Sequence, residues 1–135
     1  MPQSTPPPKA LAHAYDLGKQ SQDLHFDWDN AREVEEKVEE EWGELKAALK
    51  KWPGFKASTY EELGDILFTL VQLARHLDID PEKVLTLAND KFSKRFSLMK
   101  RMIEEEGLDI LVLSRAQKEI YWEKAKKILR EGDGG

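Results

Sequence analysis

The chain has 135 residues, no cysteine and a net charge of −5. This length is enough for one domain, and the lack of cysteine excludes a disulfide scaffold, a thiolate zinc site and a thiol nucleophile. The acidic balance gives no basic face for a nucleic-acid backbone, and no segment approaches the roughly 20 apolar residues of a membrane span. The N-terminus also lacks the apolar core of a secretory signal, so we expect a soluble, cytoplasmic protein that binds neither nucleic acid nor a membrane.

The first half of the chain predicts a tail and two helices. Residues 1–8 contain four prolines and are expected to form a flexible tail. A first helix is predicted over residues 9–22, followed by an aromatic and acidic loop over residues 25–30. A second helix is predicted over residues 31–51, because apolar side chains recur there at spacings of three and four, namely Val34, Val38, Trp42, Leu45 and Leu49.

Three further helices are predicted after the stop signal at residues 52–54. Thr59 and Glu62 have the spacing of a capping box, which predicts a helix over residues 59–77 whose wide apolar arc is buried on most sides. Asp80 and Pro81 are expected to open a long helix that ends near residue 107. Ser114, with Gln117, is expected to cap a last helix. Short connections favour antiparallel neighbours, so we predict one all-α bundle of four to five helices over residues 9–130, with a flexible C-terminus at 131–135.

Most of the glutamates on the second helix are expected to face solvent, but two of them lie beside the apolar stripe. Glu41 is about 60° from the centre of the stripe, and Glu44 shares its flank with Lys37. Two carboxylates spaced i,i+3 at the edge of a core repel each other, and desolvation adds to the cost. Such an arrangement is readily tolerated when a proton or a cation lies between them.

The third predicted helix has a second carboxylate pair at the same spacing, Glu62 and Asp65. Taken alone, this pair is also compatible with a capping glutamate and a salt bridge to Lys or Arg. Antiparallel packing, however, brings it level with Glu41 and Glu44, so four carboxylates converge. An oxygen-only site suits Mg²⁺, with Mn²⁺ as a substitute. The histidines, His13, His25 and His76, are scattered and are interpreted as surface or packing residues.

The order and spacing of these motifs resemble a known family. Residues 40–44 (EEWGE) and 62–65 (ELGD) are similar to the EExxE…ExxD signature of MazG-type nucleoside triphosphate pyrophosphohydrolases. The likeness to this family extends to further stretches, namely residues 26–28, 63–68, 73–77, 88–92 and 95–96 and the closing residues Trp122, Ala125 and Lys126. The likeness covers about residues 9–130 and is closest to the C-terminal copy of two-copy members.

The resemblance implies Mg²⁺-dependent hydrolysis of ribo- or deoxyribonucleoside triphosphates to monophosphate and pyrophosphate by attack of a metal-activated water. It implies that Glu41, Glu44, Glu62 and Asp65 hold the metal and that Glu40 and Glu41 act in catalysis, Glu40 from a second shell or as a base that orients water. It further implies substrate contacts for Lys37, Asn89, Lys91, Arg95, Trp122 and Lys126. No phosphate-binding glycine loop is present, so metal ions and these basic residues are expected to offset the triphosphate charge.

The resemblance also implies at least a homodimer, with a tetramer as a further possibility. We expect the helix face that carries Phe68 and Val71 to contact the partner, because the apolar arcs are wide for a monomer. A di-iron or di-manganese carboxylate bundle would need a Glu three residues before a His, and Leu73 stands there before His76. The remaining alternatives are a non-catalytic module that senses nucleotide or binds a protein, and a helical interaction bundle with solvated acids.

Overall fold

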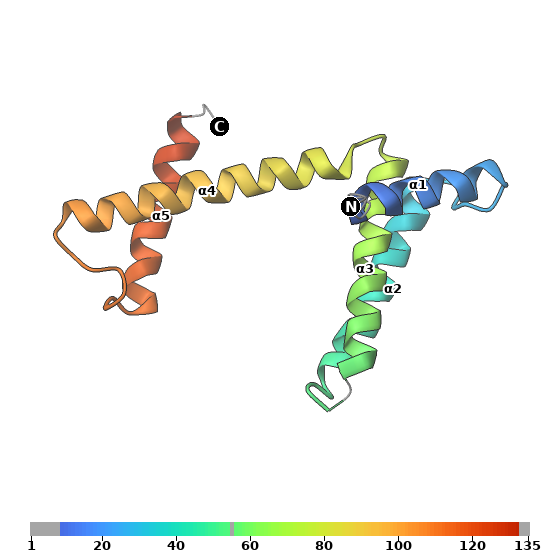
Figure 1. The fold of residues 1–135 in the computed structure, drawn as a ribbon, viewed down its shortest axis with the longest axis horizontal. Coiled ribbons are helices and arrows are strands. Elements are labelled where there is room, and N and C mark those ends of the chain that lie inside the picture. Colours follow the sequence, from blue (N-terminus) through green and yellow to red (C-terminus); the bar gives the residue numbers. More distant parts are fainter. Residues whose placement is uncertain (1–8, 55, 133–135) are drawn as a thin grey trace, which may run out of the picture. The chain divides into compact units, whose positions relative to one another are not determined.

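The computed structural model describes residues 9–54 and 56–132, so the predicted tail at residues 1–8 lies outside the described part. The described residues form helices without strands, which confirms the all-α class (Figure 1). None of these helices is long and apolar enough to cross a membrane. The last helix continues through residues 131 and 132, which were expected to be flexible. The helices are α1 (Ala10–Asp23), α2 (Ala31–Leu49), α3 (Lys56–His76), α4 (Pro81–Glu105) and α5 (Arg115–Gly132).

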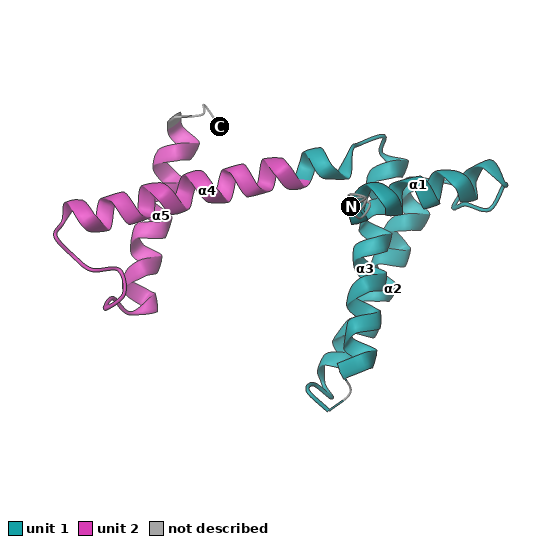
Figure 2. Cartoon of the chain, viewed as in Figure 1, with its two compact units in different colours: residues 1–84 teal, residues 85–135 magenta. Residues whose placement is uncertain are grey.

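The chain divides into two compact units, Met1–Val84 and Leu85–Gly135 (Figure 2). The first unit contains α1, α2, α3 and the first turn of α4. The second unit contains the rest of α4 together with α5. Its core consists of Met99 and Ile103 from α4 and Ala125 from α5, and the neighbouring apolar residues of both helices and their connecting loop pack around it.

Helices α2 and α3 form an antiparallel pair in the first unit (Figure 1). The face of α2 that packs inward carries Val34, Leu45 and Ala48, all of which are buried. Trp42 and Leu49, which the periodicity placed on the same stripe, are instead about half exposed. They lie at the margin of the stripe, beyond the surface that α3 covers. The predicted antiparallel pairing of these helices is therefore found, with a narrower buried face than expected.

The helix starts agree with the predicted caps at two of three positions. The Asp80 carboxylate accepts a hydrogen bond from the backbone N–H of Glu82 at 3.0 Å. Ser114 and Gln117 exchange the reciprocal bonds of a capping box, at 3.1 and 2.8 Å. The predicted cap at Thr59 is wrong, because α3 already begins at Lys56 and Thr59 is a buried helical residue. The residues before it, Lys-Ala-Ser, are compatible with helix, and the earlier start allows the threonine side chain to be buried.

The apolar arc of α3 is only partly covered by the other helices of the first unit. Leu63, Leu67 and Leu70 are 46%, 53% and 43% exposed. Within the first unit α1 and α2 pack against α3, and two neighbours cannot cover an arc of this width. Val71, which was expected to face a partner chain, is buried within the unit, whereas Phe68 is partly exposed. The surface available to a partner is thus the leucine side of the arc rather than Val71.

A buried arginine joins α3 to the loop between α1 and α2. The Arg75 guanidinium donates two hydrogen bonds to the Asp27 carboxylate, at 2.6 and 2.9 Å, and its side chain is 5% exposed. His76 Nε2 lies 3.0 Å from the same carboxylate. The bonds from Arg75 hold the pKa of Asp27 well below its ordinary value, against the opposing effect of burial.

The same arginine contributes to the contact between α1 and α3. Arg75 Nε donates to the side-chain oxygen of Gln72 at 2.8 Å, and the Gln72 amide donates to the backbone carbonyl of Ala14 at 2.8 Å. Gly18 is buried at this crossing, and a Cβ added there would collide with the side chains of Gln72 and Arg75. A glycine is therefore required for α1 to approach these two side chains closely.

We expect Asp27→Asn to lower the free energy of unfolding by about 2 kcal/mol at pH 7, because it removes the counter-ion of a buried guanidinium. Since the pKa of Asp27 is lowered in the fold, its contribution is complete above the unfolded pKa of about 4 and is lost as the pH falls below it. Urea unfolding of wild type and variant at several pH values measures the difference in free energy of unfolding and its dependence on pH.

The matched control is Asp29→Asn, which removes an exposed carboxylate two residues away and should change stability little. The role assigned to the Asp27–Arg75 pair would be contradicted if Asp27→Asn were as stable as Asp29→Asn at pH 7. It would also be contradicted if the difference in free energy of unfolding between wild type and Asp27→Asn became larger in acid.

Candidate metal-binding site

Glu41 supplies a buried carboxylate from the middle of α2. Its side chain is 8% exposed, and its Oε1 lies 3.3 Å from the Lys37 ammonium one turn earlier. Its Oε2 is buried and has no hydrogen-bond partner among the described residues. A buried carboxylate oxygen without a partner is costly, so this atom indicates a ligand or a proton that the folded chain does not itself provide.

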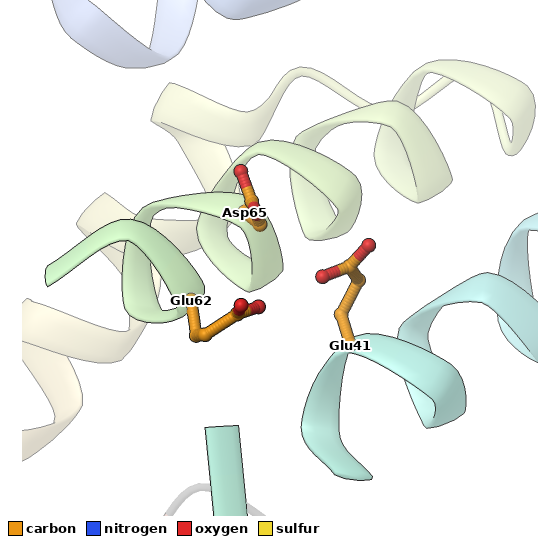
Figure 3. Close-up of side chains that lie close together, drawn as sticks. All are labelled: Glu41, Glu62 and Asp65. Carbon is orange, nitrogen blue, oxygen red and sulfur yellow. The ribbon is translucent and has the colours of Figure 1, made fainter. Parts of the chain in front are cut away.

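Glu62 and Asp65 face Glu41 from α3, at the i,i+3 spacing that puts two side chains on one side of a helix. Ligand oxygens of the three carboxylates lie within 4.8 Å of one another, and Figure 3 shows the side chains pointing toward a common space. Oε2 of Glu62 is also buried and unpartnered in the described structure. The antiparallel pairing of α2 and α3 thus brings carboxylates together that are widely separated in sequence.

The electrostatics of the cluster are those of crowded like charges. The pKa of Glu62 is raised above its ordinary value, first by desolvation and then by its hydrogen bond to Glu44 and the nearby charges of Glu44, Asp65 and Glu41. Glu44 is therefore close to Glu62, although the closest group of oxygens consists of Glu41, Glu62 and Asp65. A divalent cation would offset this repulsion, as a bound proton does.

Lys37 and Glu40 lie beside the cluster on α2. The Lys37 ammonium is 3.1 Å from Glu40 and 3.3 Å from Glu41. These partners raise the pKa of Lys37, the Glu40 hydrogen bond most strongly, against the effect of desolvation. Glu40 itself is more than half exposed. It contacts the cluster through Lys37, an arrangement that fits an indirect role better than metal ligation.

The donor set favours a hard divalent cation. The ligand atoms in the cluster are carboxylate oxygens, with no imidazole or thiolate nearby in the described residues. Mg²⁺ and Mn²⁺ prefer such ligands, whereas zinc and copper favour nitrogen or sulfur. The two unpartnered oxygens, one from each helix, are consistent with this type of ion. The residues present therefore fit a divalent metal.

The other predicted substrate-binding residues belong to the second unit. Asn89, Lys91 and Arg95 lie on α4, and Trp122 and Lys126 lie on α5. Trp122 packs against Phe92, with ring centroids 5.2 Å apart. The structure describes these residues within the second unit. Their contacts with substrate remain predictions.

A cavity of about 440 Å³ lies beside the Arg75 network in the first unit, and the sequence reasoning did not identify it. Apolar and polar side chains from α1, the 24–30 loop, the first turn of α2 and α3 line it, including Leu17, Phe26, Trp28, Phe68, Gln72 and Arg75. The signal that could have predicted the network is the pair Gln72 and Arg75, two polar residues at i,i+3 inside an otherwise apolar helix. Such residues are rarely buried unless their hydrogen bonds are satisfied.

Comparison with known proteins agrees with this geometry. The family described as MazG nucleotide pyrophosphohydrolase domain matches residues 30–99, a span that includes all of the clustered carboxylates. This chain belongs to that family.

Two curated relatives match most of the chain. The nucleoside triphosphate pyrophosphohydrolase/pyrophosphatase MazG of Thermotoga maritima is 42% identical over 87% of this chain and 44% of its own length. The nucleoside triphosphate pyrophosphohydrolase of Escherichia coli K12 is 34% identical over 94% of this chain and 47% of its own length. A Bacillus subtilis protein, YabN, described as uncharacterized, is 44% identical over 51% of this chain. The chain thus spans less than half of the length of each of the first two relatives.

We expect Glu62→Gln to raise the melting temperature of the metal-free protein at pH 7.5. Because the pKa of Glu62 is raised in the fold, wild type loses stability as the pH rises above the ordinary value of 4.5, and a neutral amide avoids that loss. Addition of Mg²⁺ should then stabilise wild type more than the variant. Differential scanning calorimetry with EDTA and with Mg²⁺ measures both effects.

Glu61→Gln is the matched control, since Glu61 precedes Glu62 on the exposed side of α3. If Glu62→Gln destabilised the metal-free protein, or if Mg²⁺ stabilised both variants equally, the carboxylate repulsion inferred for this site would be incorrect.

Proposed function

We propose that this chain is a nucleoside triphosphate pyrophosphohydrolase that requires a divalent cation, Mg²⁺ or Mn²⁺. The observation that carries the proposal is the convergence of Glu41, Glu62 and Asp65, two of which have a buried oxygen without a partner. The names of the two relatives that match most of the chain support the same reaction. The expected products are a nucleoside monophosphate and pyrophosphate, from either a ribo- or a deoxyribonucleotide.

In this proposal Glu41, Glu62 and Asp65 hold the metal, with Glu44 as a fourth carboxylate beside Glu62. A bound Mg²⁺ would supply Lewis-acid chemistry, offsetting phosphate charge and lowering the pKa of water. Lys37 orients the Glu41 carboxylate and links it to Glu40. Through this link Glu40 helps to fix the ligand arrangement, and its exposed carboxylate can accept a proton from water near the site.

The cavity next to the Arg75 network offers space for part of the substrate. Phe68, one of its lining residues, follows Asp65 by one helical turn on α3. The walls include flat apolar side chains, Phe26 and Trp28, and such surfaces favour a planar heterocycle. We propose that this cavity takes the nucleoside, while the carboxylates face the phosphate groups.

The direct test is to incubate the protein with a panel of nucleoside triphosphates, with and without Mg²⁺, and to resolve the products. We expect monophosphate and pyrophosphate only when metal is present. Asp65→Asn should lower kcat/KM by about 100-fold or more, because it replaces a charged metal ligand. Glu61→Gln, an exposed acid on the same helix, should leave it unchanged.

Two results would contradict the proposal. Release of orthophosphate in place of pyrophosphate would place the cleavage at another bond. Tight nucleotide binding without turnover, in both Mg²⁺ and Mn²⁺, would favour a non-catalytic nucleotide-sensing module. If Asp65→Asn and Glu44→Ala left nucleotide affinity unchanged as well, the acids would be ordinary surface residues of a helical interaction module.

We also propose that the chain forms a homodimer through α3. The exposed leucines Leu63, Leu67 and Leu70 lie on one helix and together form an apolar strip that the other helices of the first unit leave uncovered. Sedimentation equilibrium at micromolar concentration should give about twice the chain mass of 15.6 kDa. Leu67→Arg should shift the mass toward the monomer, whereas Leu111→Arg, at an exposed leucine of the second unit, should not. A wild-type mass of one chain would contradict this proposal.

A further inference from the structure

The cavity beside the Arg75 network has one carboxylate in its wall that the fold uses only in part. Glu33 lies in the first turn of α2 and is among the residues that line this space. Its Oε2 accepts a hydrogen bond from the backbone N–H of Asp29 at 2.9 Å. Its other oxygen has neither a hydrogen-bond partner nor a cation within 4.0 Å among the described residues. The Glu33 carboxylate can therefore accept hydrogen bonds from a ligand.

The neighbouring polar side chains of the wall are engaged within the protein. The Arg75 guanidinium donates to Asp27 and to the side-chain oxygen of Gln72. The amide of Gln72, a fully buried residue, donates to a backbone carbonyl of α1. The Ser21 hydroxyl donates its proton to the Phe26 carbonyl, so that its oxygen can only accept further bonds. These carboxylate, amide, hydroxyl and guanidinium groups thus leave mainly acceptors to a ligand, and the free oxygen of the cavity's second carboxylate is the strongest of them.

A free carboxylate in the wall of a cavity discriminates between the nucleobases. Its oxygen accepts bonds from amino groups and ring N–H groups, and it repels carbonyl oxygens and phosphates. Guanine presents an amino group and a ring N–H side by side on one edge. Cytosine and adenine present an amino group next to a ring nitrogen that is an acceptor, and uracil and thymine present one ring N–H between two carbonyl oxygens. Guanine therefore matches a free carboxylate best.

We propose that Glu33 determines the base specificity of this cavity and selects guanine nucleotides, by accepting hydrogen bonds from the 2-amino group and the ring N1–H. The inference rests on the proposed function, because it requires the nucleoside to occupy this cavity, and it adds the base that the cavity favours. The backbone N–H of Asp29 holds one oxygen of the carboxylate and leaves the other for the base. The negative charge also directs the phosphate groups away from the cavity.

The test compares two nucleotides that differ by one amino group. Inosine triphosphate (ITP) is guanosine triphosphate (GTP) without the 2-amino group, so the ratio of their kcat/KM values isolates the contact to that group. We expect the wild type to favour GTP by about tenfold, because a hydrogen bond to a charged acceptor is lost with ITP. Glu33→Gln should lower this ratio several-fold, because a neutral acceptor replaces a charged one, while its amide oxygen can still accept the Asp29 bond.

The matched control is Glu35→Gln, at an exposed glutamate of the same helix, which should keep the wild-type ratio of kcat/KM values. The comparison of GTP with ITP on the wild type decides the proposal even if Glu33→Gln does not fold. Equal kcat/KM values of the wild type for the two nucleotides would overturn the proposal, and so would a folded Glu33→Gln protein that keeps the full preference for GTP.

A binding measurement separates this inference from the proposed reaction. Isothermal titration calorimetry of the full chain in EDTA, with guanosine monophosphate and inosine monophosphate, reports base recognition without metal or turnover. The wild type should bind the guanosine nucleotide about tenfold more tightly, and Glu33→Gln should lose most of this difference. Equal affinities, or no binding of guanosine monophosphate, would refute the inference and leave the proposed hydrolysis intact if turnover is observed. A preference for guanosine monophosphate that depends on Glu33, without turnover of any triphosphate, would refute the proposed function alone.

Discussion

The crowding of carboxylates between α2 and α3 is the constraint on which the first unit depends. Packing the apolar stripe of α2 against α3 requires the two helices to approach, and the approach buries oxygens of Glu41 and Glu62 beside other acids. Lys37 offsets part of this charge from one side. A proton or a cation can offset the rest. Such an arrangement of carboxylates is therefore unfavourable by itself and is suited to binding a divalent ion.

The hydrogen bonds of Arg75 and Gln72 join α3 to α1 and to the loop before α2. Arg75 lies on the same helix as Glu62 and Asp65, and through Asp27 it fixes the loop that leads into α2. The buried Gly18 lets α1 pack directly on Gln72 and Arg75. The cavity proposed for the nucleoside is thus built from residues whose positions this network determines. The second unit carries four basic side chains around one hollow, namely Lys91, Lys94, Arg95 and Arg130.

The elements of the fold could be predicted from periodicity and caps, but their exposure could not. Asp80 and Ser114 carry local signals, and both act as the caps that their sequence context predicts. The convergence of Glu41 with Glu62 and Asp65 followed from i,i+3 spacing and antiparallel packing. The prediction of buried residues was wrong where burial depends on the neighbours of a helix. The exposed leucines of α3 have the same pattern as buried ones, and nothing in the spacing shows how much of that arc the neighbouring helices of the first unit cover. The partnership of Asp27 with Arg75 joins residues far apart in sequence, which local patterns cannot reveal.

The central claim is that the carboxylates of α2 and α3 bind the metal ion used in catalysis. Anomalous diffraction from crystals grown with Mn²⁺ and a nucleoside triphosphate analogue that resists hydrolysis tests it most directly, because the signal locates the ion itself. The account predicts an anomalous peak bound by oxygens of Glu41, Glu62 and Asp65. Well-ordered nucleotide with no peak at these carboxylates, or with manganese bound only elsewhere, would contradict it.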